Sequence, residues 1–569
     1  MTSKTSFCNT ALLRKNITRC WPLWTFYTVV LLLTVFLPLF ALCTAVRART
    51  AFDSSINFER FSVLYMNVGV LVQLPYAVLC AGFGFGYLHK TRSAYMLHAF
   101  PLTRGVLFRT NLLCGLLFAA APWLTVTLLG FAVLAPALGV KAAAYQLLRG
   151  GLIVGLQYLF FYGLAVLCMH TTGKTVNGVL RYLVLNFAAV LLYWLACLLL
   201  DPLLYGIRVS AGAAMVLSPA VKLLEMGLFG SGLSGWAMWC YLGCIAAVGI
   251  AMTAVSWLFY RKRQMESCGE AVAFGFLRPI FKYFLAVLGA LCIGIPASTV
   301  AFGDIYDGAR ILPTLAFLLV GGFLGYFGAE MMLKRSARVF RGKVWIGFAC
   351  FALVLVFGLS AARFDLFGIV RRVPAADKVA SVEFSLGYAP QGVIPLTAAE
   401  DIDKMREIHR AALEDYSSID QNAYYPDSDR LNLTYHLKNG STIERTYLLT
   451  PQANKEAVWQ LNALLRRGDL NRAYFERLHL ENATSVRVEY RDEGDRYKER
   501  TLNTEEIREL NEKLLCDAQE GKLLAFSDSD GGNYSVYFEL RDSEGRRDMF
   551  WLYIPRSATA TDGYLRSLD

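Results

Sequence analysis

Few residues in this sequence have the type and spacing that catalysis or metal binding requires. Gly173-Lys174-Thr175 resembles the end of a phosphate-binding loop, but such a loop needs a glycine five positions before the Gly-Lys pair, where this chain has Cys168. The six histidines form no HExxH motif, and no CxxC pair is present. We therefore expect no catalytic residues, no metal site, no cofactor site and no ATPase site in this chain.

Two basic loops carry the more informative side chains. The loop at 87–113 mixes basic residues with apolar ones and reaches Pro101 before a new helix begins. A bare turn does not need that apolar content, whereas a short helix that docks on a partner does, because a few buried anchors supply most of the energy of an interface. A helix lying on the bilayer surface is the alternative. The candidate contact residues of this loop are Tyr95, Met96, Leu97, Phe100, Pro101 and Arg104. The loop at 260–282 is a second candidate, through Arg261, Arg263, Glu266 and Glu270.

Apolar runs long enough to cross a membrane occupy most of the first 363 residues. Hydrophobic residues make up 55% of the chain and charged residues 18%, with a mean hydropathy of +0.40, so the chain is more apolar than a soluble protein. A membrane helix needs about 20 apolar residues. We predict an all-α membrane bundle of about nine helices over 24–363, a count open by one because the loop after the fifth run could hold a re-entrant helix. The runs lie near 24–46, 62–88, 106–137, 147–169, 179–200, 236–260, 282–301, 311–333 and 344–361.

The charges of the loops predict an orientation. The net charge of +11 divides into 31 Lys and Arg against 10 Asp and Glu in residues 1–373, and 25 against 35 in the remainder. The basic excess therefore lies in the apolar part, where alternate loops are rich in Lys and Arg, and nucleic-acid binding is not needed to explain it. By the positive-inside rule the N-terminus is cytoplasmic, and nine spans then put the C-terminal region outside. Residues 1–23 are predicted to be an amphipathic interfacial segment, with an ordinary basic flank as the alternative.

The C-terminal region reads as a water-soluble α+β domain. A polar linker at 364–378 leads into strand and helix signals over 379–569, where Cys516 is the single cysteine and no intrachain disulfide can form. Strands are predicted at 379–385 and 484–490, helices at 398–414, 453–466, 503–519 and 560–568, and hairpins at 431–449 and 534–554. The order strand–helix–hairpin–helix occurs twice. This favours an internal duplication, with copies at 379–466 and 484–568, although convergence of a simple pattern would give the same signals.

Four segments resemble the permease subunits of type-2 ABC transporters, particularly a bacterial group with a large extracytoplasmic C-terminal domain. They are RKNITRCWPLW at 14–24, MLHAFPLTRGVLF at 96–108, RKRQMESCGEAVAF at 261–274 and FDLFGIVRRVP at 364–374. The resemblance covers the membrane part well and the outer domain more faintly. It implies a multi-pass protein of the bacterial cytoplasmic membrane, without its own ATPase site, that pairs with an ABC ATPase subunit and with a second permease copy or a paralogue.

The resemblance also implies a role for the first basic loop. Residues Ser93–Arg104 would form a coupling helix that receives motion from the ATPase, and ATP would be bound by that partner subunit. Family members often have six spans, so the three additional spans and the outer domain leave the substrate open among peptides, lipids and drugs. The alternative function is a membrane-bound sensor or assembly factor whose outer domain binds a ligand without transport. An intramembrane enzyme is a third hypothesis, but the sequence contains no recognisable group of catalytic residues to support it.

Overall fold

The structure is a computed structural model. It describes residues 8–41, 54–201, 203–207, 212–228, 235–264, 268–302, 311–387, 393–414, 429–491, 497–524, 534–541 and 547–568. The chain divides into two compact units. The first holds residues 1–196, 210–295 and 317–352, and the second holds residues 197–209, 296–316 and 353–569.

Nine helices in the described ranges are long and apolar enough to cross a membrane. Such helices satisfy every backbone polar group internally, which a lipid environment requires. They are Trp21–Ala41, which contains α2 (Trp21–Leu31) and the π-helix η1 (Leu32–Phe36); Leu64–His89, from α4 (Ser54–Phe85) and η2 (Gly86–His89); Arg104–Pro136 in α6 (Arg104–Leu138); α7 (Val140–Thr171); α8 (Thr175–Leu200); α11 (Trp236–Lys262); Leu277–Phe302, from α12 (Leu277–Gly289), η4 (Ala290–Gly294) and α13 (Ile295–Phe302); Leu312–Lys334 in α14 (Ile311–Lys334); and α15 (Gly342–Arg363).

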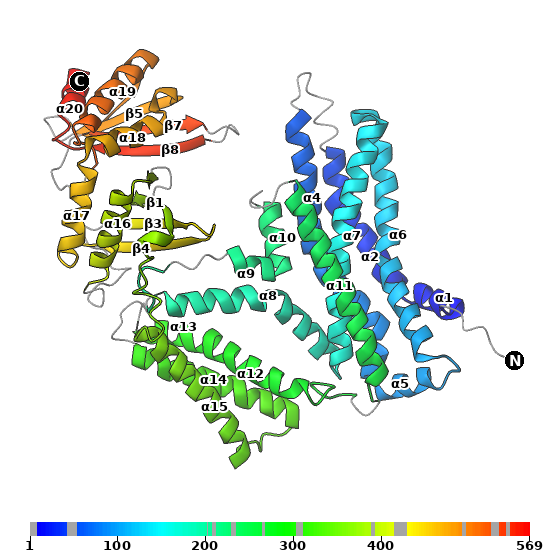
Figure 1. The fold of residues 1–569 in the computed structure, drawn as a ribbon. Helices are drawn as coiled ribbons and strands as arrows, with labels where there is room; N and C mark the ends of the chain where they lie inside the picture. Colours follow the sequence, from blue (N-terminus) through cyan, green and yellow to red (C-terminus); the bar gives the residue numbers. More distant parts are fainter. Residues whose placement is uncertain are drawn as a thin grey trace. The chain divides into compact units, whose positions relative to one another are not determined.

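Helices α4, α7 and α11 run side by side and form the centre of the first unit (Figure 1). Close approach of α7 and α11 depends on glycine. A Cβ atom on Gly163 would lie 2.1 Å from the carbonyl oxygen of Gly249, and one on Gly249 would lie 2.3 Å from that of Leu159. The buried core between these helices contains large aromatic side chains such as Tyr158 and Phe161, so the first unit is tightly packed.

Helices α12 and α14 pack in the same glycine-dependent way at Gly289 and Gly321. Glu330 of α14 is the carboxylate that sequence places inside a predicted span, and its oxygens lie 2.8 Å from the Lys334 ammonium and 3.5 Å from that of Lys282. These ion pairs offset the cost of placing the charge of Glu330 among apolar helices.

The remaining helices of the first unit are short. They are α1 (Thr10–Arg19), α5 (Thr91–His98), α9 (Gly212–Leu217) and α10 (Pro219–Leu228). Asn9 caps α1 by accepting a hydrogen bond from the backbone N–H of Leu12 at 2.9 Å. The Asn67 side chain donates to the carbonyl of Gly227 at 3.1 Å, which fixes the end of α10 against α4. The apolar loop after the fifth span is therefore partly helical.

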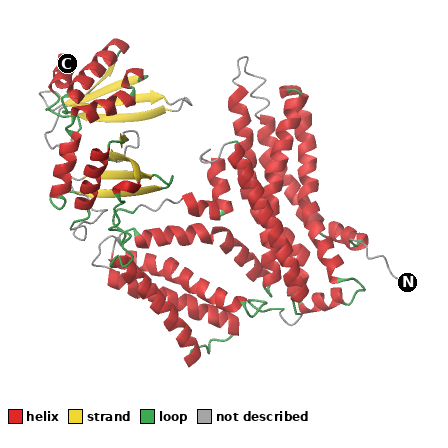
Figure 2. Ribbon diagram, viewed as in Figure 1, coloured by secondary structure: helices red, strands yellow, loops and turns green. Residues whose placement is uncertain are grey.

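Two four-stranded antiparallel sheets form the C-terminal region, with helices beside them (Figures 1 and 2). Their strand orders are β2-β1-β3-β4 and β6-β5-β7-β8. The strands are β1 (Val379–Leu386), β2 (Ile394–Leu396), β3 (Asp429–Leu437), β4 (Thr442–Leu449), β5 (Ser485–Arg491), β6 (Tyr497–Leu502), β7 (Tyr534–Arg541) and β8 (Arg547–Ile554). The helices are α16 (Ala399–Ala412), α17 (Lys455–Leu465), α18 (Gly468–Leu478), α19 (Thr504–Gln519) and α20 (Thr559–Ser567), with one-turn helices η6 (Ala376–Lys378) and η8 (Leu480–Asn482). Each sheet buries one face in its own hydrophobic core.

The predicted layout, nine apolar helices followed by an α+β region, is confirmed for the described ranges. Both hairpins are present, and the first turns at Asn439-Gly440, where Gly440 has a φ of +82°. The sequence missed strands β2 and β6 and helix α18. Each half therefore has two strands before its first long helix, where the sequence predicted one. Strand β2 is three residues long and contains Pro395, and β6 carries charged residues, so neither shows an apolar alternation.

The segment at 203–207, which follows α8, is part of the second unit. The ring centroid of Tyr205 lies 5.3 Å from that of Tyr447 on β4, and the Tyr205 hydroxyl donates to the carbonyl of Leu448 at 3.2 Å. The backbone N–H of Thr446 donates to the carbonyl of Gly206 at 3.0 Å. This segment therefore covers the outer edge of the first sheet, where β4 is the terminal strand.

Candidate functional site

Helix α5 presents apolar side chains on its outer side. Ala94 is fully buried and attaches the helix to the first unit, whereas Tyr95, Met96 and Phe100 are 60, 58 and 51% exposed. Leu97 is half-buried, and Pro101 is exposed. Large apolar side chains that are exposed together on a short helix outside the predicted spans mark a contact surface for another molecule. We call these five residues, Tyr95, Met96, Leu97, Phe100 and Pro101, the α5 surface.

Arg104 joins the two basic loops to each other. It occupies the first position of α6, and its Nη1 lies 3.0 Å from the carbonyl oxygen of Arg261 and 3.3 Å from that of Arg263. Arg261 lies in the last turn of α11 and Arg263 directly follows the helix, where backbone carbonyls have no partner within the helix. The guanidinium of Arg104 is half-buried and is engaged within the chain. Arg104 therefore connects the start of α6 to the end of α11.

His98 and two tyrosines extend this connection. The Nε2 atom of His98 lies 3.3 Å from the Tyr260 hydroxyl, which lies 3.0 Å from the hydroxyl of Tyr87. The Nδ1 atom of His98 lies 2.9 Å from the carbonyl oxygen of Ala94, so His98 bridges α5 and α11. Burial, assisted by the nearby Arg104 cation, lowers the pKa of His98 below its ordinary value. The ring is therefore neutral at pH 7.

Arg263 lies inside the second loop rather than on its surface. It is 6% exposed, and it donates to the carbonyl oxygens of His170 at 2.8 Å and Leu88 at 3.2 Å. Burial lowers the pKa of Arg263, but a guanidinium stays protonated. A cation beside the last carbonyls of α7 is favoured by the helix dipole. Arg263 thus joins η2 and the ends of α7 and α11.

The other candidate residues of the second loop differ in their exposure and in their contacts. Arg261 is exposed, and its guanidinium lies 5.9 Å from the ring centroid of Trp257. The backbone carbonyl of Glu270 accepts a hydrogen bond from the N–H of Gly173 at 3.0 Å, and its carboxylate pairs with Arg278 at 3.0 Å. Glu266 lies outside the described residues. Four basic residues at the ends of these two loops are exposed: Lys90, Arg92, Arg261 and Lys262.

The structure therefore brings together the two loops that the sequence marked separately. Tyr87 and Tyr260, which link them, were not among the sequence candidates. They lie at helix ends, each directly after or before apolar residues such as Phe259 and Leu88, so nothing in the sequence distinguishes them from residues of the core. Among the described residues, no group of three or more His, Cys, Asp or Glu side chains is placed to hold a metal ion.

Comparisons with known proteins add no assignment. No protein-family model matches the chain, and searches of curated proteins and of solved structures also found no match. The nine long apolar helices are typical of a multi-pass membrane protein.

Proposed function

We propose that this chain is the permease subunit of an ATP-binding cassette transporter of the bacterial cytoplasmic membrane, with ATP hydrolysed by a separate subunit. The observation that carries the proposal is the α5 surface between two candidate spans, where Tyr95 and Met96 on α5 and Phe100 just after its end are more than half exposed. Exposed apolar anchors in a loop that also exposes Lys90 and Arg92 fit a protein partner with an apolar pocket and acidic residues nearby.

The contacts of Arg104 and His98 supply a route for motion. Helix α5 continues into α6 through residues 99–103, and it reaches the end of α11 through His98 and Tyr260. Arg104 attaches the start of α6 to the same end of α11. A partner that moves α5 would therefore move α6 and α11 together. That displacement would give the substrate alternating or gated access. The partner permease would be a second copy of this chain or a paralogue, and either would couple through the same helices.

The proposed orientation puts the N-terminus in the cytoplasm and the C-terminal region outside. The basic loops support it. The contact of Tyr205 with Tyr447 gives independent support for an even number of spans between the segment at 203–207 and the C-terminal sheets. The segment at 203–207 follows the fifth candidate span and the sheets follow the ninth, so the four spans between them return the chain to the same face.

The shared order of strands and helices in the two halves of the C-terminal region supports an internal duplication.

Replacing Phe100 with Asp tests the coupling role. The full chain is purified in mild detergent, the co-purifying polypeptides are identified, and ATP hydrolysis is measured after reconstitution. We expect an ABC ATPase to co-purify and its rate of ATP hydrolysis to rise when it is bound to this chain. Phe100→Asp should abolish that rise and leave membrane insertion of the chain unchanged. Phe364→Asp is the control, because Phe364 is also exposed but lies after the ninth candidate span.

Two results would count against the proposal. Stimulation that survives in Phe100→Asp would mean that the α5 surface is not the coupling element. Recovery of a signalling protein with no ATPase would favour the second candidate, a membrane-bound sensor or assembly factor whose outer domain binds a ligand.

A further inference from the structure

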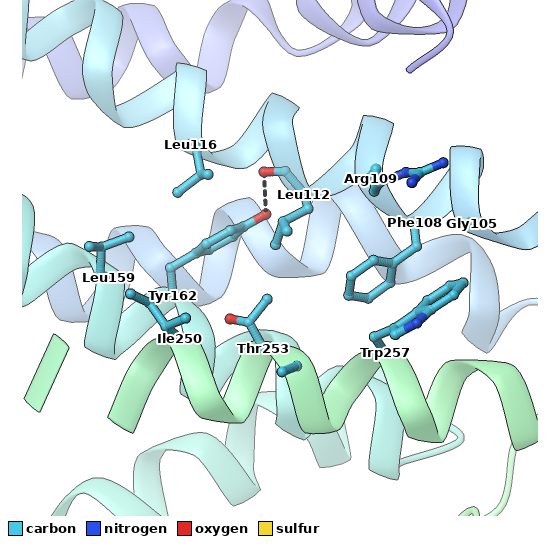
Figure 3. A pocket seen from close by; sticks show the side chains of 11 residues that line it. Gly105, Phe108, Arg109, Leu112, Leu116, Leu159, Tyr162, Ile250, Thr253 and Trp257 are labelled. Atoms are coloured by element: carbon cyan, nitrogen blue, oxygen red, sulfur yellow. Dashed lines mark hydrogen bonds between the residues drawn. The ribbon is translucent and has the colours of Figure 1, made fainter. Parts of the chain in front are cut away.

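A narrow groove runs along the first unit between α6, α7 and α11 (Figure 3). Its volume is about 440 Å³. One end is lined by aliphatic side chains, Leu116, Leu159 and Ile250, with Leu112 near the middle, while Gly105, Arg109 and Trp257 lie at the other end. Tyr162 lies between the ends, and its hydroxyl donates to the carbonyl oxygen of Leu112 at 3.3 Å. The groove is therefore apolar along its length and cationic at one end.

The cationic end lies near the ends of two candidate spans. Helix α6 begins at Arg104 and α11 ends at Lys262, so Arg109 and Trp257 are each within about two turns of a helix end. From Gly105 to Leu116 the groove follows α6 for about 16 Å, at 1.5 Å per residue. The hydrocarbon core of a bilayer is about 30 Å thick, so the groove extends over about one leaflet. Tryptophan at such a depth is typical of the membrane interface.

Arg109 lines this end of the groove, and Arg261 lies against Trp257, which is another lining residue. Nη2 of Arg109 lies 3.7 Å from the position that a Cβ atom on Gly105 would occupy, so the side chain extends toward the start of α6. The guanidinium of Arg261 lies 5.9 Å from the ring centroid of Trp257. A group bound here would meet positive charge at the interface and aliphatic side chains below it. That sequence of environments matches an anionic headgroup followed by an acyl chain.

The chemistry of the groove favours a lipid as its occupant. Most of its lining side chains are apolar, and the charged one, Arg109, lies at one end. An acyl chain with an anionic headgroup complements that arrangement. An apolar groove that opens within a bilayer is also in contact with lipid at very high local concentration.

We propose that this groove is a binding site for one anionic phospholipid of the leaflet on the α5 side, with an acyl chain between α6 and α11 and the phosphate beside Arg109 and Arg261. The site requires only that the helices span a membrane, and it does not depend on the proposed transport function. Since the groove lies between the two helices that Arg104 joins, bound lipid contributes to their packing.

Native mass spectrometry of the detergent-purified full chain tests the site. Phosphatidylglycerol and phosphatidylcholine with identical acyl chains are titrated in parallel. We expect one phosphatidylglycerol to be retained with a preference of about tenfold, the change that one charged hydrogen bond supplies. Arg109→Gln should remove the preference and Arg109→Lys should keep it. Ala254→Phe, which fills the groove, should lower the occupancy of both lipids, whereas Ala251→Phe, exposed on the same helix, should not.

Three outcomes would overturn the proposal. Equal retention of the two lipids by the unaltered chain would remove the case for a headgroup site. Full occupancy in Ala254→Phe would place the lipid elsewhere, and this variant keeps the test decisive if Arg109→Gln does not fold. A change from dimer to monomer in Ala254→Phe with lipid retention unchanged would identify the groove as a contact between copies of the chain.

Discussion

The ring of Tyr205 packs against the ring of Tyr447, and the two residues come from parts of the chain that are separated by four candidate membrane helices. Gly206 makes this contact possible. It has a φ of +76°, and a Cβ atom at this position would lie 2.0 Å from the Tyr447 ring. The edge of the first sheet is thus completed by a segment from outside the C-terminal region of the sequence.

Gly206→Ala should loosen the first sheet. The positive φ costs about 1–2 kcal/mol for a residue with a Cβ atom, and displacement of the Tyr447 ring adds a packing cost of about 1–3 kcal/mol. Hydrogen exchange of the amides at 431–449 in the full chain measures the loss. Gly440→Ala is the matched control, because its φ is +82° but its Cβ atom would meet nothing within 4 Å. Equal effects of the two substitutions would show that the segment at 203–207 does not stabilise the sheet.

The same contact predicts that position 201 and Cys516 face the same side of the membrane. Asp201→Cys and native Cys516 are examined separately in a background that lacks the other cysteines, with a membrane-impermeant thiol reagent on intact cells. Both sites are exposed and should react in intact cells. Ser93→Cys on α5 should react only after permeabilisation. Labelling of Cys516 without labelling of position 201 would contradict the parity of four spans between them.

His409 should make the stability of the first sheet depend on pH. Its Nδ1 lies 2.9 Å from the Tyr435 hydroxyl and its Nε2 lies 2.6 Å from the Tyr447 hydroxyl. Burial, helped by the cation of Arg445, lowers the pKa of His409 to about 3. The unfolded chain therefore binds a proton near pH 6.5 that the folded chain does not bind, and stability falls as the pH falls below that value.

Between pH 7 and pH 5.5 the expected loss from His409 is about 1 kcal/mol. It is measured as faster hydrogen exchange of α16 and β3, after correction for the intrinsic pH dependence of exchange. His409→Gln retains hydrogen-bonding capacity without titrating in this range, so it should remove most of the dependence. A His409→Gln chain that loses as much protection as the unaltered chain would assign the effect to other groups.

Gly249→Ala should force α7 and α11 apart, because its Cβ atom would lie 2.3 Å from the carbonyl oxygen of Leu159. We expect the Tm of the detergent-solubilised chain to fall, with a cost of about 1–3 kcal/mol for overpacking. Gly243→Ala on the same helix meets no atom within 4 Å, and it should be neutral or stabilising by up to about 1 kcal/mol. A similar Tm for the two variants would mean that the helices do not depend on this close contact.

The sequence by itself determined the elements whose signals are local. Each candidate span is an apolar run of its own, and a helix satisfies its backbone groups without a distant partner, so hydropathy was sufficient to locate the nine helices. The hairpin around Asn439-Gly440 likewise depends on a turn that adjacent residues specify. The two basic loops were recognised from composition alone.

Only the tertiary structure decided which residues meet across long separations. Strand β6 has little apolar pattern, and it forms because β5 offers it a backbone edge. Arg104 and Arg263 are similar to Arg261 in the sequence, yet their side chains reach carbonyls at helix ends, whereas that of Arg261 is exposed. Tyr205 has the appearance of an ordinary loop residue. These roles depend on groups distant in the chain that folding brings within hydrogen-bond or ring contact, and such contacts leave no local periodicity in the sequence.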